Sequence, residues 1–171
     1  MSCSNNKTLT QFPENLPWCP ENLVMENNSI ANMHKNALNP CGDTIINMSL
    51  RNCGIKTIEN GVFRNFYKLV FLDLRNNTIK KIHEDIFIGL TSINEIHFEY
   101  NLLEEVERSD NDLLEQEETP KGYLYLNNNN LKRFEGGLPR RMEVMYLENN
   151  AIEEIVPETS VYSLVSCTHS T

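Results

Sequence analysis

The feature of this sequence that most constrains its fold is a short apolar pattern, L-x-x-L-x-L-x-x-N-x-L, which recurs six times. One clear copy reads Leu69, Leu72, Leu74, Asn77 and Ile79. The asparagine position of the six copies is filled, at spacings of 25, 24, 24, 28 and 21 residues, by Asn28, Cys53, Asn77, Asn101, Asn129 and Asn150. A repeat of this length cannot bury its apolar side alone, so the pattern predicts a solenoid in which stacked repeats share one core.

The L-x-L part of each copy predicts a short strand with one buried side, because apolar residues alternate there with exposed ones. The asparagine then turns inward where the strand ends, and its amide can satisfy backbone groups that the turn leaves unpaired. The six marker residues should therefore form one inward column, an asparagine ladder. Cys53 replaces one asparagine, and we interpret it as a buried structural thiol, since a catalytic thiol there would have no access to substrate.

A second pattern, I-x-x-I-x-x-x-x-F-x-x-L-x-x-L, follows the first in the longer copies, as at Ile79, Ile82, Phe87, Leu90 and Ile93. With both patterns, residues 3–164 resemble the extracellular leucine-rich-repeat family, and the repeats are similar to those of Toll-type receptor ectodomains and insect secreted proteins. The resemblance implies an α/β fold, a right-handed horseshoe-shaped solenoid of about six repeats. It also implies a parallel sheet on the concave face and a mostly irregular convex side.

The N-terminal segment resembles the end of an extracellular cap through Cys3, Leu9, Pro13, Leu16 and Pro17. We therefore divide the chain into a truncated cap at 1–19, leucine-rich repeats at 20–164 and a tail at 165–171. The segment lacks an apolar leader and the earlier cap cysteines. We interpret the chain as a fragment or short member of an extracellular or cell-surface protein, with a cytoplasmic relative as the alternative.

Four N-x-S/T triplets are candidate glycosylation sites, at Asn6, Asn27, Asn47 and Asn76. Of the neighbours Asn76 and Asn77, the second belongs to the ladder, so the first should be the exposed one. Sugars on Asn27, Asn47 and Asn76 would cover the N-terminal part of the concave face.

The five cysteines are an odd number, so at least one is unpaired within the chain, and Cys53 is the natural free one. Cys19 and Cys41 lie near the starts of consecutive repeats, which would make them neighbours in space. We hypothesise a disulfide between them, and the alternative is that both are reduced.

The chain is acidic, with a net charge of −9, and residues 104–118 hold eight acids and one arginine. This stretch lies in the longest spacing, so we predict an acidic insertion at 104–120. Asp110, Asn111 and Asp112 carry oxygen ligands that Ca²⁺ prefers, although a solvated acidic loop is the favoured interpretation. The acidity argues against nucleic acid as the main partner, and no apolar run approaches a membrane span in length.

No arrangement typical of an enzyme is present in the sequence. His34, His83, His97 and His169 lack metal-ligand spacing. Neither a glycine-rich phosphate loop nor a hydrolase nucleophile elbow occurs. We therefore expect no catalysis, no metal site and no cofactor.

The exposed positions of the predicted strands differ between the two halves of the chain. The N-terminal copies supply mostly small and polar residues, whereas the C-terminal copies supply four tyrosines beside a histidine and a glutamate: Tyr100, Tyr123, Tyr125, Tyr146, His97 and Glu99. Tyrosines are enriched at interfaces, so we predict that a protein ligand or co-receptor binds there. The alternative is that these rings only cover the sheet or, in a fragment, face a missing neighbour.

These observations predict a protein-recognition module in innate immunity or cell adhesion. Two alternatives stay open at this point. One is an intracellular scaffold or regulator with the same fold, and the other is a truncated relative without a ligand of its own.

Overall fold

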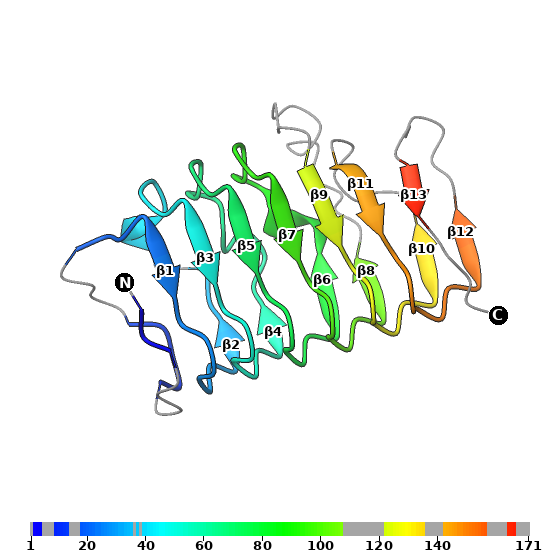
Figure 1. Ribbon diagram of the computed structural model, residues 1–171, viewed down its shortest axis with the longest axis horizontal. Helices are drawn as coiled ribbons and strands as arrows, with labels where there is room; N and C mark the ends of the chain where they lie inside the picture. The colour runs from blue at the N-terminus through cyan, green and yellow to red at the C-terminus, as the bar shows by residue number, and fades with distance from the viewer. Residues whose placement is uncertain are drawn as a thin grey trace.

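The computed structural model describes residues 2–4, 9–13, 18–35, 37, 39–107, 122–135, 142–156 and 164–166. These residues wind into a right-handed solenoid of parallel strands, the horseshoe architecture predicted from the repeats (Figure 1). Each L-x-L unit forms one strand of a long sheet, which lies on the concave face.

The long sheet contains seven strands within the described residues, all parallel to their neighbours. They are β1 (Asn22–Val24), β3 (Asn47–Ser49), β5 (Phe71–Asp73), β7 (Glu95–His97), β9 (Gly122–Tyr125), β11 (Met142–Tyr146) and β13 (Leu164–Ser166). The first six coincide with the six L-x-L units. The seventh, β13, extends the sheet into residues that the sequence analysis assigned to a tail.

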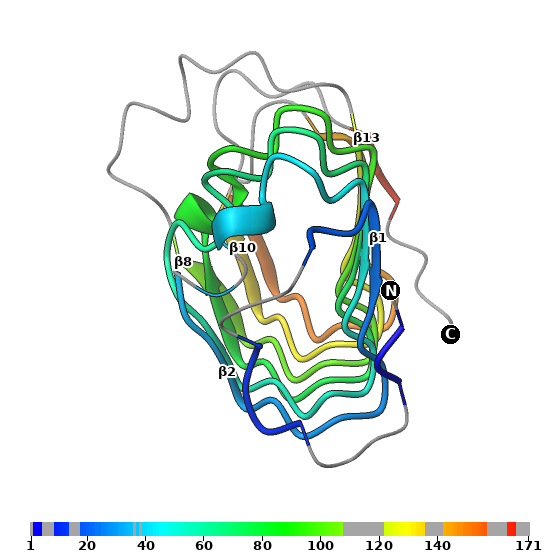
Figure 2. The same cartoon turned by 90° about the vertical axis from the view of Figure 1, so that its left-hand side faces the viewer.

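Short strands form the opposite wall of the solenoid, facing the long sheet across the core (Figure 2). They pair two by two: β2 (Asn32–Met33) with β4 (Thr57–Ile58), β6 (Lys81–His83) with β8 (Glu105–Glu107), and β10 (Arg133–Glu135) with β12 (Glu154–Val156). Residues 105–107, assigned from the sequence to the start of the acidic insertion, are strand instead. The rest of that insertion lies outside the described residues.

Helix is scarce on this wall. In the described part of the chain it consists of two short 3-10 segments, η1 (Asn39–Cys41) and η2 (Glu84–Phe87). The helical part of the α/β class is thus represented only by these turns. A short 3-10 turn needs few residues per repeat, which is compatible with repeats of 21 to 28 residues.

The core fills the space between the two walls. One residue in the same register position of each of the first six strands of the long sheet is buried: Leu23, Met48, Leu72, Ile96, Leu124 and Met145. Phe63 and Phe66 pack edge to face with ring centroids 5.5 Å apart. Full burial of one such side chain contributes about 1.5–3 kcal/mol, so stacking the repeats supplies the stability that an isolated repeat lacks.

Candidate protein-binding surface

Asparagines of the ladder follow five of the long-sheet strands, and Cys53 takes the same position after β3. The Nδ2 group of Asn77 donates to the carbonyl oxygens of Leu50 and Leu74, at 3.0 and 2.9 Å. Its Oδ1 accepts from the N–H groups of Cys53 and Ile55, both at 3.0 Å. Each asparagine therefore links its own turn to the preceding one. The same pattern recurs at Asn101, Asn129 and Asn150. The Nδ2 group of each donates to two carbonyl oxygens, and its Oδ1 accepts from a backbone N–H of the preceding turn.

Cys53 occupies the same column with fewer hydrogen bonds. Its thiol donates to the carbonyl oxygen of Met25 at 2.8 Å, and the sulfur accepts from the backbone N–H of Asn28. Burial raises the pKa of the Cys53 thiol, with the N–H of Asn28 acting against that shift and the charge of Glu26 adding to it. The thiol is fully buried and stays protonated, as expected of a structural residue.

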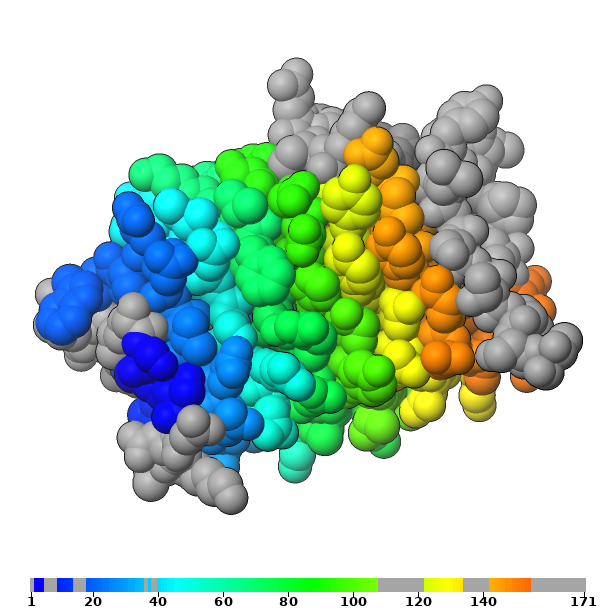
Figure 3. Space-filling model, in the orientation of Figure 1, coloured from blue at the N-terminus to red at the C-terminus, as the bar shows by residue number. Residues whose placement is uncertain are grey.

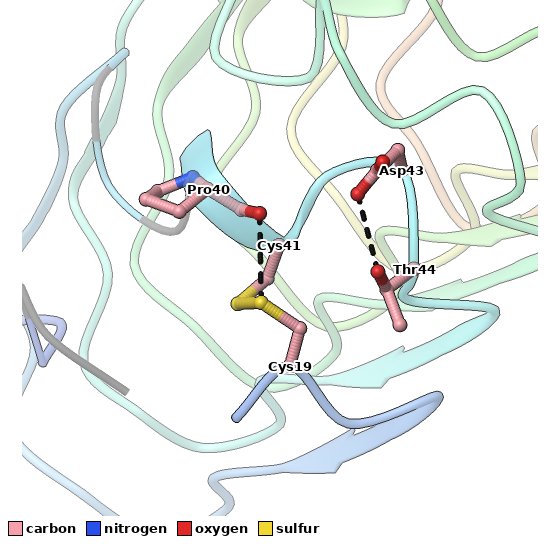
Figure 4. Close-up of a disulfide and its surroundings, with 5 residues drawn as sticks. All are labelled: Cys19, Pro40, Cys41, Asp43 and Thr44. Atoms are coloured by element: carbon pink, nitrogen blue, oxygen red, sulfur yellow. Dashed lines mark hydrogen bonds between the residues drawn. A yellow bond between two sulfur atoms is a disulfide. The ribbon is translucent and has the colours of Figure 1, made fainter. Parts of the chain in front are cut away.

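A disulfide joins Cys19 to Cys41, as the sequence predicted (Figure 4). Their Cα atoms lie 5.0 Å apart, and Cys41 belongs to η1. The bond ties the segment before β1 to the turn before β3. Cys3 and Cys53 are free thiols among the described residues.

The outward side chains of the long sheet form rows that cross the strands in register. The central row contains Val24, Ser49, Asp73, His97, Tyr125 and Tyr146. The row before it contains Asn22, Asn47, Phe71, Glu95, Tyr123 and Val144. Figure 3 shows this face, on which the repeats lie side by side as successive bands of colour.

Three rings of the central row stack on one another. The rings of His97 and Tyr125 are 4.3 Å apart and those of Tyr125 and Tyr146 are 4.6 Å apart, with interplanar angles of 3°. We call His97, Tyr125 and Tyr146 the aromatic row. Phe71 extends it from the neighbouring row, because its ring lies 5.2 Å from that of His97. Phe71 was not among the site residues predicted from the sequence.

Two glutamates hold His97 in place. Its Nδ1 lies 3.0 Å from a carboxylate oxygen of Glu99, and its Nε2 lies 3.2 Å from one of Glu95. Only the imidazolium donates to both at once. Burial lowers the pKa of His97, and so does the charge of Arg75, but the hydrogen bonds and charge of the two glutamates outweigh them, so the pKa is raised.

Tyr125 and its surroundings favour a neutral phenol. Burial raises the pKa of Tyr125, and the negative charges of Glu95 and Glu99 raise it further. Nearby, Glu99 Oε2 and Asn127 Oδ1 are buried acceptors without a hydrogen-bond partner in the described part of the chain. This end of the face therefore has more acceptors than donors.

The N-terminal half of the same face is paired within itself. Asn47 donates to Asn22 at 2.7 Å, and Ser49 donates to Glu26 at 2.6 Å. Asp73 is buried and accepts two hydrogen bonds from the Arg75 guanidinium, at 2.6 and 2.9 Å. This Asp–Arg pair was not among the residues predicted from the sequence, although the D-x-R spacing on one strand face was a signal for it.

The position before each ladder residue adopts a left-handed backbone. The φ angles lie between 54° and 58°, and the residues are Asn27, Asn52, Asn76, Tyr100, Asn128 and Asn149. Asparagine tolerates this conformation better than other residues with a side chain, whereas a bulky residue there is strained. Tyr100 is the exception in the column, and its side chain is 59% exposed.

The predicted glycan positions divide between this column and the sheet. Asn27 and Asn76 occupy the left-handed position, and Asn47 lies in β3 on the outward face. Asn6 lies outside the described residues, as do Asp110, Asn111 and Asp112, the calcium candidates. No group of three or more His, Cys, Asp or Glu among the described residues is placed to hold a metal.

A groove of about 690 Å³ lies on the opposite wall, where β4 and β6 belong to separate sheets. Its lining mixes cations such as Lys56 and Lys80 with Glu104, Glu107 and apolar residues. It shares no residue with the aromatic row. Within the described residues, no helix is long and apolar enough to cross a bilayer.

The parallel solenoid, its inward asparagines and its repeat length together define a leucine-rich-repeat protein. In agreement, the family model described as "Leucine rich repeat" matches residues 45–103. The chain is 32% identical over 130 residues to Podocan of Mus musculus, which covers 72% of this chain and 21% of Podocan. It is 24% identical to Osteomodulin of Bos taurus, over 88% of this chain and 39% of that protein.

Among solved structures, a crystal structure of a TLR13–ssRNA13 complex superposes with a TM-score of 0.65 at 20% identity. The match covers 86% of this chain and 23% of that one, and it concerns the fold. The chain thus spans about a fifth of Podocan, two fifths of Osteomodulin and a quarter of the TLR13 chain.

Proposed function

We propose that this chain is an extracellular protein-recognition module whose protein ligand or co-receptor binds the C-terminal half of the concave face. The residues that we assign to the contact are His97, Glu99, Tyr100, Tyr123, Tyr125 and Tyr146. The observation that carries the proposal is the aromatic row, in which three rings from three strands stack in register. Rings held in this way lose little conformational freedom on binding, while tyrosine supplies large contact area.

Tyr100 supports the same location independently. Five of the six residues in its column are asparagine, and only Tyr100 places a bulky side chain on a left-handed backbone. Strain that persists at an exposed position without a packing benefit is a reason to infer function. Tyr100 precedes the ladder residue of β7, the strand that also carries His97.

The disulfide supports an extracellular setting, because such bonds persist mainly in oxidising compartments. We place the module in innate immunity or cell adhesion because its repeats and cap-like N-terminal segment resemble those of Toll-type and secreted family members. Binding rather than catalysis is the proposed activity. An intracellular scaffold would be expected to keep Cys19 and Cys41 reduced, so thiol counting on the native protein separates that alternative.

The test uses the double variant Tyr125→Ala with Tyr146→Ala. Secreted and cell-surface proteins retained by the wild-type chain are compared with those retained by the variant, and any candidate partner is then purified for affinity measurement. We expect the affinity to fall by about 2–4 kcal/mol, as for central aromatic contacts at other interfaces. Because both residues lie outside the core, the thermal unfolding of the variant should change little.

The matched control is Tyr67→Ala with Leu102→Ala, which removes two exposed apolar side chains elsewhere on the surface. It should leave the affinity unchanged. Undiminished binding by the Tyr125/Tyr146 variant would contradict the proposal and place the contact elsewhere, with the acidic insertion predicted at 104–120 as the first region to test.

A further inference from the structure

The charge of the proposed contact surface differs from that of the remaining face. Residues 95–100, 123–128 and 144–149 cover the three strands that carry the aromatic row, and they contain three glutamates and neither lysine nor arginine. The equivalent residues of the three preceding strands, 22–27, 47–52 and 71–76, contain two acids and two arginines. The C-terminal half is therefore negative, and the N-terminal half is balanced.

The three glutamates lie on both sides of the aromatic row. Glu95 belongs to the row before it, and Glu99 and Glu148 belong to the row after it. Two of them contact His97. A ligand lying along the three rings would thus meet carboxylates on either side.

The hydrogen-bonding capacity of this surface also favours one ligand chemistry. Glu99 Oε2 and Asn127 Oδ1 are buried acceptors without a partner within the described structure, so a donor on a ligand reaches them only where these side chains turn outward. Tyr125 keeps its proton, and its oxygen can accept as well as donate. Arginine and lysine carry donors and no acceptors, and their aliphatic stems can pack on ring edges.

This inference rests on the proposed function and specifies the partner. We propose that the aromatic row and its flanking glutamates Glu95, Glu99 and Glu148 bind a basic, arginine- or lysine-rich segment of a partner protein. A phosphate backbone fits this surface poorly, because the three carboxylates outnumber the single imidazolium of His97 and repel it. The basic side chains form ion pairs with the glutamates, while the rings supply apolar contact area.

The experiment measures the affinity of the whole chain for labelled oligo-arginine, oligo-lysine and oligo-glutamate peptides of equal length, and for a single-stranded RNA. The test variant is Glu95→Gln, Glu99→Gln and Glu148→Gln. The control variant is Glu104→Gln, Glu153→Gln and Glu154→Gln, which changes the net charge by the same amount at exposed positions on the opposite side.

We expect the wild type to prefer oligo-arginine and oligo-lysine, with an affinity that falls as salt is added. The test variant should lose about tenfold in this affinity, while the control variant changes by less than about twofold. Equal losses in both variants would mean non-specific attraction by net charge and would overturn the proposal. RNA or oligo-glutamate binding that requires the aromatic row would overturn it as well.

Competition then separates this inference from the proposed function. Binding of a purified partner could require Tyr125 and Tyr146, yet be neither displaced by oligo-arginine nor weakened in the test variant. In that case the proposed binding face is supported and the basic-segment inference fails. If the partner is insensitive to both tyrosines, the proposed function itself fails, whatever the peptides do.

Discussion

The two halves of the long sheet share a backbone and differ in chemistry. In the N-terminal half, outward polar groups bond to their neighbours, as in the Asn22–Asn47, Glu26–Ser49 and Asp73–Arg75 pairs. In the C-terminal half, the same positions carry stacked rings and glutamates. Because the buried residues and the ladder are alike in both halves, the fold does not determine what lies outward. The outward rows are where selection for a partner can act.

The comparison also separates two kinds of polar interaction. The ladder amides lie inside the solenoid and bond to backbone groups, and successive asparagines share a carbonyl oxygen, as Asn77 and Asn101 share that of Leu74. The pairs on the N-terminal half satisfy the hydrogen-bonding groups of side chains that would otherwise be available to a ligand. We therefore expect changes in the ladder and the disulfide to affect stability, and changes in the aromatic row to affect binding.

The largest expected loss of stability comes from removing the disulfide. Cys19 and Cys41 are 22 residues apart, and a cross-link closing a loop of that size contributes about 3 kcal/mol. The variant Cys19→Ser with Cys41→Ser should lose about that much in chemical denaturation. The basic-peptide affinity should be preserved where the chain stays folded. Reductant should destabilise the wild type and not the variant, and equal responses would contradict a stabilising bond.

A smaller loss is expected within the ladder. Asn101→Leu removes the donors to Leu74 and Phe98 and the acceptor for the Ile79 N–H. The Leu74 and Phe98 carbonyl oxygens keep Asn77 and Asn129 as donors, but the buried Ile79 N–H loses its partner. That loss should lower the free energy of unfolding by about 1–3 kcal/mol. Asn130→Leu is the control, because Asn130 is exposed and should change stability by no more than about 0.5 kcal/mol. Similar values for both variants would refute the role of the ladder.

Tyr100→Asn should raise the stability of the chain and lower its affinity for the partner. The substitution replaces a bulky residue, which is strained on a left-handed backbone, with asparagine, which tolerates that conformation. The free energy of unfolding should therefore rise by about 1 kcal/mol. Partner affinity should fall. Tyr67→Asn is the matched control, since Tyr67 is also exposed and has no positive φ angle. A destabilised Tyr100→Asn variant would show that the ring packs usefully and is not strained for function.

The smallest effect is a pH dependence centred on His97. Its pKa is raised in the folded state, so the stabilisation is fully present below the unfolded pKa of about 6.5 and is lost as pH rises through the folded pKa. The stability difference between wild type and His97→Gln should therefore be larger near about pH 6 than near about pH 9. Adding Glu95→Gln and Glu99→Gln to both proteins should flatten this dependence. A difference that grows with pH would contradict the assigned sign.

Much of the candidate site could be predicted from the sequence, because residues at the same position of successive repeats lie side by side in the solenoid. Tyr125 and Tyr146 hold the same position in their copies, so the row that joins them followed from alignment alone. The contact of Phe71 with His97 did not, since it runs diagonally between two rows and depends on ring orientation. Likewise, the glutamates that bond His97 lie two residues away on its own strand, and only side-chain geometry brings both carboxylates to the imidazole.

The sequence by itself determined the solenoid and the strands at the L-x-L units, because these depend on local pattern and period. It offered the Cys19–Cys41 bond as one of two alternatives. Tertiary structure alone decided the rest. The left-handed column before the ladder arises where the chain leaves the strand. Only the structure shows that Tyr100 places a bulky side chain in this column. The strand at 105–107 forms because β6 lies beside it and supplies its hydrogen bonds, although its acidic composition predicted a loop. Pairing between neighbouring turns outweighs local composition there, because backbone groups must find partners whatever side chains they carry.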